Sequence, residues 1–259
     1  MTANFRPTAE PGLKSLIDTA LFAPPAAIAS SARMGADLRV FAYVLVAAIA
    51  VTTAISCFGP NIDLAVTRLF ADPITGQFPS SRPIHRYAFV YRDEGMIALI
   101  VCLACIGLSW LNYLSWKLPV ISFRTATYLT TAYLLGPGLL VNGILKVYSG
   151  RPRAIETLDF GGPLPFVNWW DWTGACPIRC SFVSGEAAAA AWLIGPALIV
   201  PAPWRPLAIG AATMFFIYTA TMRMAAGGHF LSDVLFAGLS SVLVLLLLRP
   251  LFYRKHPER

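Results

Sequence analysis

The chain has 259 residues, of which 57% are apolar and only 13% are charged, and its mean hydropathy is +0.63. Soluble domains carry roughly 25% charged residues, so this composition excludes an ordinary soluble domain. An aromatic share of 12% excludes a disordered chain. The net charge of +7 does not indicate nucleic-acid binding, because long uncharged runs separate the basic residues. We therefore expect an integral membrane protein with no nucleic-acid partner.

Six apolar runs predict six membrane-spanning helices, because each approaches the roughly 20 residues that cross a bilayer. The runs cover residues 40–58, 95–116, 125–145, 187–204, 206–222 and 230–248. The fold class that we expect is all-α, a bundle of six transmembrane helices. The expected division is a cytoplasmic N-terminal segment at 1–37, the six-helix membrane domain at 38–251 and a cytoplasmic tail at 252–259.

The loops predict the orientation of this bundle. Lys and Arg are more frequent in the loops on the N-terminal side, which places the N-terminus in the cytoplasm. The first apolar run begins near residue 38, too late for a cleaved secretory signal, and this favours a retained signal anchor. The bias is shallow, because the third outer loop and the start of the last run also hold cations. The cations in these two outer segments therefore have a role other than orienting the bundle in the membrane.

Two cysteines, Cys176 and Cys180, lie in the third outer loop at C-x3-C spacing. In an oxidising periplasm they could form a disulfide that braces the loop, and unpaired thiols are an equal alternative. No His lies near them and only two thiols are present, so the pattern does not indicate zinc. The segment 169–172 consists of three tryptophans and one aspartate. It indicates an anchor at the membrane interface, or alternatively a site that binds a sugar or acyl group.

Three polar segments interrupt the apolar pattern, at residues 146–154, 181–186 and 223–233. Under the six-helix topology all three lie at the outer face. Three cations, Lys146, Arg153 and Arg223, suit phosphate oxygens, and Arg151 is a candidate fourth.

The same segments carry candidate reacting groups. Ser184 and Gly185 stand where the fourth helix begins, and free backbone N–H groups at a helix start favour an anion. His229 and Asp233 share a helix face at i, i+4, so the carboxylate could fix the ring tautomer and leave the other nitrogen free to attack. Glu186 is an acidic group among cations and a candidate general acid.

Each of these residues also has an ordinary structural explanation. An Arg at the end of a membrane helix often anchors at the interface, and an isolated Ser-Gly-Glu is often only a helix cap. Asp233 is the exception, because a carboxylate inside a span is costly and usually functional. The shared side of the membrane and the regular spacing favour one phosphate-binding catalytic site.

The spacing resembles the type 2 phosphatidic acid phosphatase superfamily, whose pattern is K-x6-R-P, then P-S-G-H, then S-R-x5-H-x3-D. Lys146-x6-Arg153, the V-S-G-E at 183–186 and Arg223-x5-His229-x3-Asp233 follow it in order. The chain departs from the pattern at three positions. These are Ala154 for Pro, Met222 for Ser and Glu186 for the first His. Glu186 would act as proton donor only with a pKa well above about 4.

The resemblance implies a lipid phosphatase of the bacterial inner membrane with its site facing the periplasm. His229 would form a phosphohistidine, Asp233 would orient it and Glu186 would protonate the leaving alcohol. Lys146, Arg153, Ser184, Gly185 and Arg223 would hold the phosphate, with neither a metal nor another cofactor.

The V-S-G-E form resembles lipid A phosphatases and favours lipid A as substrate, with phosphatidylglycerol phosphate, phosphatidic acid or undecaprenyl pyrophosphate as alternatives. Two other functions remain open. One is a lipid phosphotransferase that uses the same intermediate. The other is a non-catalytic phospholipid-binding or transport protein, in which Glu186 marks lost activity. The sequence does not determine the oligomeric state.

Overall fold

The computed structural model describes residues 31–59, 61–78, 94–114, 122–177, 180–201 and 203–253. These residues form helices joined by loops and contain no β-strand, apart from one isolated bridge between Thr157 and Leu164. The prediction of an all-helical fold is therefore confirmed for the described part of the chain. The ends of the expected terminal segments, residues 1–30 and 254–259, lie outside it.

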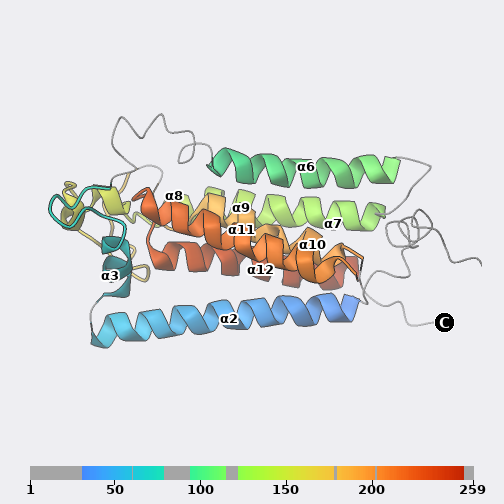
Figure 1. The fold of residues 1–259 in the computed structure, drawn as a ribbon, viewed down its shortest axis with the longest axis horizontal. Helices are drawn as coiled ribbons and strands as arrows, with labels where there is room; N and C mark the ends of the chain where they lie inside the picture. The colour runs from blue at the N-terminus through green and yellow to red at the C-terminus, as the bar shows by residue number, and fades with distance from the viewer. Residues whose placement is uncertain are drawn as a thin grey trace, which may run out of the picture.

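The long helices run side by side (Figure 1). They are α2 (Ser31–Phe58), α6 (Glu94–Leu114), α7 (Phe123–Tyr133) continued by the π-helix η3 (Leu134–Leu145) and by α8 (Lys146–Tyr148), α9 (Gly185–Trp192) with α10 (Ile194–Ile199), α11 (Arg205–Ala225) and α12 (Leu231–Phe252). The short helices α3 (Ile62–Arg68), η4 (Ala154–Glu156) and η5 (Leu158–Phe160) gather with their loops at one end, on the left in Figure 1. We call this the loop end of the bundle.

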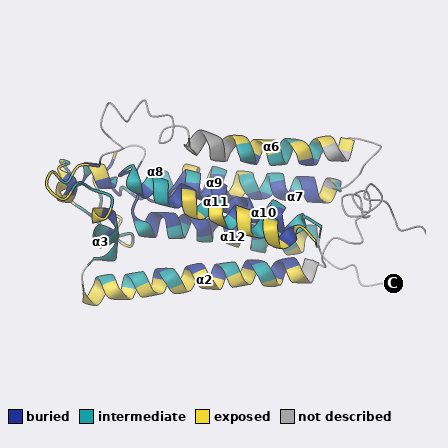
Figure 2. Cartoon of the chain, viewed as in Figure 1, coloured by how far each residue is buried: buried dark blue, intermediate teal, exposed yellow. Residues whose placement is uncertain are grey.

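Four helical stretches are long and apolar enough to cross a membrane: Arg33–Phe58, Arg124–Tyr148, Arg205–Ala225 and Leu231–Phe252. The other two predicted spans correspond to shorter apolar stretches, Ile100–Leu111 and Gly185–Ile199, in the described residues. Four spans are therefore supported and the six-span topology stays a prediction. Apolar side chains along the outside of α2 are exposed (Figure 2), as expected of a surface that faces lipid.

The α9 helix lies inside the bundle, in contact with α6, α11, α12 and η3. Its five alanines, at 187–191, are buried, and small side chains of this kind let neighbouring helices approach closely. Below them Trp192 is fully buried and donates from Nε1 to the Leu129 carbonyl at 3.2 Å. The α9 helix ends at Trp192 because Pro196, four residues on, has no N–H to donate to its carbonyl. The first turn of α9 is thus held at the loop end.

The π-helix η3 leads to Lys146. It contains Pro137, whose ring cannot fit a regular α-helical turn, so the wider π-helical turn relieves the clash. Asn142 Nδ2 donates to the Pro137 carbonyl at 2.7 Å. The side chain of Asn142 is thereby held against the first turn of α9, where it limits which residue can occupy position 185.

Candidate functional site

The structure brings the three predicted polar segments together at the loop end. Glu186 lies between two of the predicted partners, with its Oε1 at 3.6 Å from Arg223 Nη2 and its Oε2 at 3.9 Å from His229 Nε2. Arg223 is in the last turn of α11, Glu186 is in the first turn of α9, and His229 lies in the turn before α12. Three helix ends therefore present an imidazole, a carboxylate and a guanidinium to one another.

The turn between α11 and α12 sets the position of His229. Gly227 has φ of +67°, which favours glycine, and a Cβ there would lie 2.5 Å from the ring of Phe78. Phe78 is itself fully buried against Phe160 in the small core of the loop end. The chain can therefore turn tightly enough to bury His229, which is 1% exposed.

His229 has a different partner from the one we expected. Its Nδ1 lies 2.7 Å from the Ser181 carbonyl, whereas the nearer Asp233 oxygen, Oδ2, is 3.8 Å away. A carbonyl only accepts, so Nδ1 carries the proton and Nε2 keeps its lone pair. Burial lowers the pKa of His229 and outweighs the opposite effect of Asp233 and Glu186, while Arg223 adds to the lowering. The imidazole is therefore a neutral group whose free nitrogen faces Glu186.

Asp233 instead connects several pieces of backbone and side chain. It is fully buried, and its Oδ2 accepts from the Phe230 N–H at 2.8 Å and from the Ser181 hydroxyl. Its Oδ1 accepts from Arg151 Nη1. Because Ser181 supplies the carbonyl that binds His229, Asp233 acts on the imidazole through Ser181 rather than by a direct hydrogen bond.

Arg151, the candidate fourth phosphate ligand, is buried in this network instead. It is 1% exposed and pairs with Asp233 and with Asp63, whose Oδ2 lies 2.8 Å from Nη2. Its Cζ lies 4.5 Å from the ring centroid of Phe230. Burial acts to lower the pKa of Arg151, but the two carboxylates outweigh it and raise the pKa. Two carboxylates engage this guanidinium, so it is not available to a phosphate.

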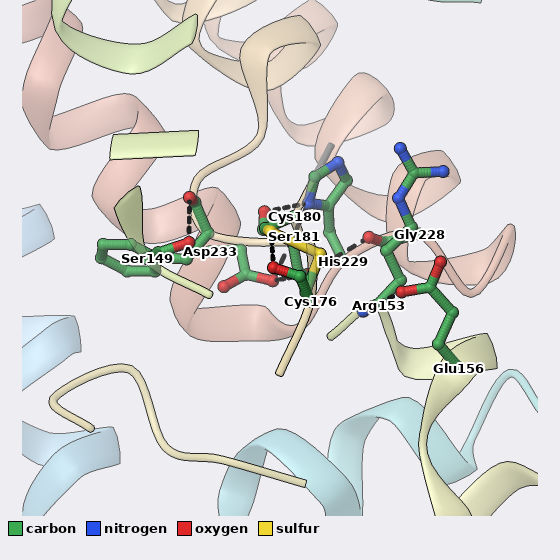
Figure 3. The surroundings of a disulfide bond; sticks show 10 residues. Ser149, Arg153, Glu156, Cys176, Cys180, Ser181, Gly228, His229 and Asp233 are labelled. Carbon is green, nitrogen blue, oxygen red and sulfur yellow. Dashed lines mark hydrogen bonds and ion pairs between the residues drawn. A yellow bond between two sulfur atoms is a disulfide. The ribbon is translucent and has the colours of Figure 1, made fainter. Parts of the chain in front are cut away.

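Lys146 and Arg153 are the other two cations that the sequence predicted to bind phosphate. Lys146, the first residue of α8, is close enough to Glu186 to act on its charge. Burial acts to raise the pKa of Glu186, but the positive charges of Arg223 and Lys146 outweigh burial and hold this pKa well below its usual value. The guanidinium of Arg153 points to the same side as the His229 ring (Figure 3). Glu186 is therefore ionised when no phosphate is bound.

Ser184 and Gly185 begin α9. The Ser184 hydroxyl accepts from the Ala187 N–H at 3.3 Å and so serves as the N-cap, as the ordinary explanation of Ser-Gly-Glu predicts. A Cβ on Gly185 would lie 2.4 Å from Asn142 Oδ1, which explains the glycine sterically. The first N–H groups of a helix have no intrahelical acceptor, and those of α9 belong to the same turn as Glu186.

One donor in the cluster has no acceptor. Arg223 Nε is buried and has no hydrogen-bond partner among the described residues. A buried N–H without an acceptor is costly, so the geometry suits an anion that is bound for part of the time. No group of three or more His, Cys, Asp or Glu side chains in the described part of the chain is arranged to hold a metal ion. Independence from metals stays a prediction.

Cys176 and Cys180 form a disulfide, the first of the two alternatives that their spacing left open. The bond lies directly beside Ser181 (Figure 3). The Cys176 N–H donates to the Gly150 carbonyl and the Ser181 N–H to the Arg151 carbonyl, at 2.9 and 2.8 Å. The disulfide thus braces the segment whose carbonyl orients His229.

The aromatic loop at 169–172 is partly anchored in the protein. Trp169 donates from Nε1 to Thr53 Oγ1 at 3.1 Å and packs on Phe236, so it fixes the loop against α2 and α12. Trp170 and Trp172 are 40% and 51% exposed. Their exposure beside the loop end suits either of the two roles predicted for them.

Comparisons with known proteins agree with this geometry. Residues 125–257, more than half of the chain and including all three polar segments, match the model of the PAP2 superfamily. Lipid A 4'-phosphatase from Rhizobium etli is 48% identical over 113 residues, 44% of each chain. The protein of the same name from Rhizobium leguminosarum is 47% identical over 111 residues, 43% of this chain and 48% of that one. The matches therefore span less than half the length of these two relatives.

A more distant relative matches over a longer range. Lipid A 4'-phosphatase from Francisella tularensis subsp. novicida is 32% identical over 203 residues, 76% of this chain and 88% of that protein. No solved structure matches the chain. The family model, the length of the Francisella match and the gathered motif residues together lead to one conclusion: the chain belongs to the PAP2 superfamily.

Proposed function

We propose that the chain is an integral membrane phosphatase that removes phosphate from a lipid phosphomonoester. The observation that carries this proposal is the cluster in which Arg223 and His229 both face Glu186, while Arg223 Nε lacks an acceptor in the described chain. Lys146 and Arg153 add positive charge from the segment that follows η3. Such a site attracts a multiply charged anion and places a neutral imidazole nitrogen beside it.

In the first step, His229 Nε2 attacks phosphorus in line with the leaving oxygen. The P–O bond to the lipid alcohol breaks as the P–N bond forms, and Glu186 gives a proton to the departing oxygen. Nδ1 keeps its proton and donates it to the Ser181 carbonyl, 2.7 Å away, so the ring gains positive charge without losing its orientation. Arg223, Lys146, Arg153 and the first amides of α9 stabilise the equatorial oxygens.

Glu186 can donate a proton only if substrate binding changes its charge state. A bound phosphate dianion offsets the cations that keep Glu186 ionised, so the carboxylate then takes up a proton. In the second step Glu186, once again a carboxylate, removes a proton from water. The water oxygen attacks phosphorus, the P–N bond breaks, and inorganic phosphate leaves neutral His229 behind.

We infer that lipid A is the preferred substrate class. Three relatives carry the name lipid A 4'-phosphatase, and the longest of their matches covers 203 residues. A glycolipid phosphate also suits a site at the end of apolar helices with exposed Trp170 and Trp172 nearby. Transfer to another lipid would use the same intermediate, so the acceptor distinguishes a phosphotransferase from a phosphatase.

We place the loop end of a six-helix bundle on the periplasmic side of a bacterial inner membrane. The disulfide between Cys176 and Cys180 supports this side, because such bonds persist in the periplasm and are rare in the cytoplasm. Charge bias in the sequence favours the same orientation.

The purified chain should release inorganic phosphate from lipid A in mixed micelles, and His229→Ala should lower this release by at least about 10³-fold, because the nucleophile is lost. Phosphate release is followed across a panel of lipid A, phosphatidylglycerol phosphate, phosphatidic acid and undecaprenyl pyrophosphate. Orthovanadate, which mimics the five-coordinate phosphorus, should inhibit the wild type. Equal trace release by the wild type and His229→Ala would instead support a non-catalytic lipid-binding protein.

Glu186→Gln keeps the size of the side chain but cannot transfer a proton. We expect kcat for lipid A to fall by about 10²- to 10⁴-fold while KM changes little, since the removed step is proton transfer. Glu186→Asp, which keeps a carboxyl group one methylene farther back, should retain more activity than Glu186→Gln. Unchanged turnover in Glu186→Gln would remove Glu186 from the mechanism.

The proposed orientation can be tested with single cysteines in a Cys57→Ser background. Leu158, the first residue of η5 at the loop end, is 64% exposed. Trp204, which is 51% exposed, directly precedes α11, and it is the other end of α11 that carries Arg223 at the loop end. A membrane-impermeant maleimide should label Leu158→Cys in spheroplasts, because the loop end faces outward, and should label Trp204→Cys only after permeabilisation. The reverse pattern would place the site in the cytoplasm.

A further inference from the structure

We propose that Asp63 and Arg151 are positioning residues that hold the imidazole of His229 in its reactive orientation through Asp233 and Ser181. Neither residue belongs to the family pattern that the sequence displays, and both are nearly inaccessible, at 7% and 1% exposed. The proposal rests on the proposed function in one respect, that His229 is the nucleophile. The structural part, that these two residues set the ring orientation, stands on its own contacts.

The first link joins α3 to the start of α12. Asp63 Oδ2 accepts from Arg151 Nη2 at 2.8 Å and from the Ser232 hydroxyl at 2.6 Å, and Oδ1 accepts from the Ser232 N–H at 2.8 Å. Arg151 Nη1 also donates to the Ser232 hydroxyl, at 2.8 Å. Asp63 thereby fixes the first turn of α12, which begins two residues after His229.

The second link runs from Arg151 to the imidazole. Arg151 Nη1 donates to Asp233 Oδ1, the Ser181 hydroxyl donates to Asp233 Oδ2, and the Ser181 carbonyl accepts from His229 Nδ1 at 2.7 Å. Arg151 also holds Ser181 directly, because its backbone carbonyl accepts from the Ser181 N–H at 2.8 Å. Ser181 is thus fixed at both its hydroxyl and its amide by the network that Asp63 completes.

The charges explain why Asp63 matters to a ring that it does not touch. Asp63, Arg151 and Asp233 carry two negative charges and one positive charge in a buried site. If the charge of Asp63 is removed, Arg151 has Asp233 as its remaining carboxylate partner, and Ser232 loses an acceptor for its hydroxyl. Because a buried charge is stable only in good geometry, Arg151 and Asp233 would readjust and move Ser181 with them. Arg223 and Glu186 face the imidazole from the opposite side and would not oppose this movement.

Asp63→Asn tests this with little change of shape. We expect kcat to fall by about 30- to 100-fold, since misplacing a reacting group by about 1 Å costs about 10²-fold, while KM stays within about 3-fold. The matched control is Asp159→Asn, which removes an exposed ion pair with Arg68, 3.4 Å apart, at the same end of the molecule. Asp159→Asn should keep the wild-type kcat. Both are measured well below their unfolding temperatures.

A spectroscopic readout separates positioning from a merely structural role. The chain has three histidines, so in a His85→Gln, His256→Gln background a ¹⁵N-histidine label reports His229 alone. The Nδ1–H proton, which Nδ1 donates to the Ser181 carbonyl, should give a slowly exchanging signal in the wild-type background and in Asp159→Asn. In Asp63→Asn the signal should shift or exchange rapidly. Ser181→Ala, which keeps every charge, should change the same signal and lower kcat by about 10-fold.

The outcomes are distinct. A fall in kcat together with a changed Nδ1–H signal supports the proposal, and wild-type values of either quantity in folded Asp63→Asn overturn it. A rise in KM with constant kcat also overturns it. If Asp63→Asn does not fold, Ser181→Ala decides by the same two measurements. If the wild type releases no lipid phosphate, the proposed function fails, and the Nδ1–H signal alone still tests the positioning.

Discussion

The loop end of this protein depends on one buried carboxylate. Asp233 receives hydrogen bonds from Arg151, from Ser181 and from the backbone of Phe230, and these come from three separate segments of the chain. Isolated in an apolar interior, a carboxylate would be strongly unfavourable, so its stability requires all of these donors together. That requirement fixes the segment after η3, the segment before α9 and the turn before α12 relative to one another. The imidazole of His229 takes its place from that arrangement.

The cations on the other side of the imidazole serve a different purpose. The inner side of the site, with Arg151 between two carboxylates, is internally satisfied and nearly inaccessible. The outer side, with Arg223 and Lys146 against one Glu186, carries excess positive charge and an N–H of Arg223 with no acceptor in the described chain. In the mechanism that we propose, the incoming phosphate balances this charge and at the same time allows Glu186 to take up a proton. Binding and activation of the acid would therefore be one electrostatic event.

Much of the fold followed from hydropathy, and part of the site followed from spacing. The uncharged runs predicted the helices, and the order of the three polar segments predicted that His229, Glu186 and Arg223 would meet. Hydropathy could not predict the break after Trp192 or the π-helix around Pro137, because both come from backbone geometry inside apolar sequence. Asp63 was missed because 88 positions separate it from Arg151, and only the folded chain brings them together.

Arg151 and Arg153 show the limit of spacing most clearly. Only Pro152 separates them, and their chemistry is identical, so the sequence offered both as phosphate ligands. In the structure the two arginines have different neighbours. Arg151 lies between two buried carboxylates, while Arg153 points to the side of the His229 ring. Likewise the i, i+4 spacing of His229 and Asp233 suggested a direct hydrogen bond. The acceptor for His229 Nδ1 is instead the backbone carbonyl of Ser181. A sequence motif cannot predict such a contact, because every residue has a backbone carbonyl.

The central claim is that Nε2 of His229 becomes covalently attached to phosphorus. It is tested most directly by mixing the purified protein with lipid A that carries ³²P at its phosphate, quenching in alkali within the first turnover and locating the label by mass spectrometry. The account predicts up to one phosphoryl group per chain, on the peptide that contains His229, stable in alkali and lost in acid. Phosphate release with no labelled peptide, or with label on a different residue, would contradict it.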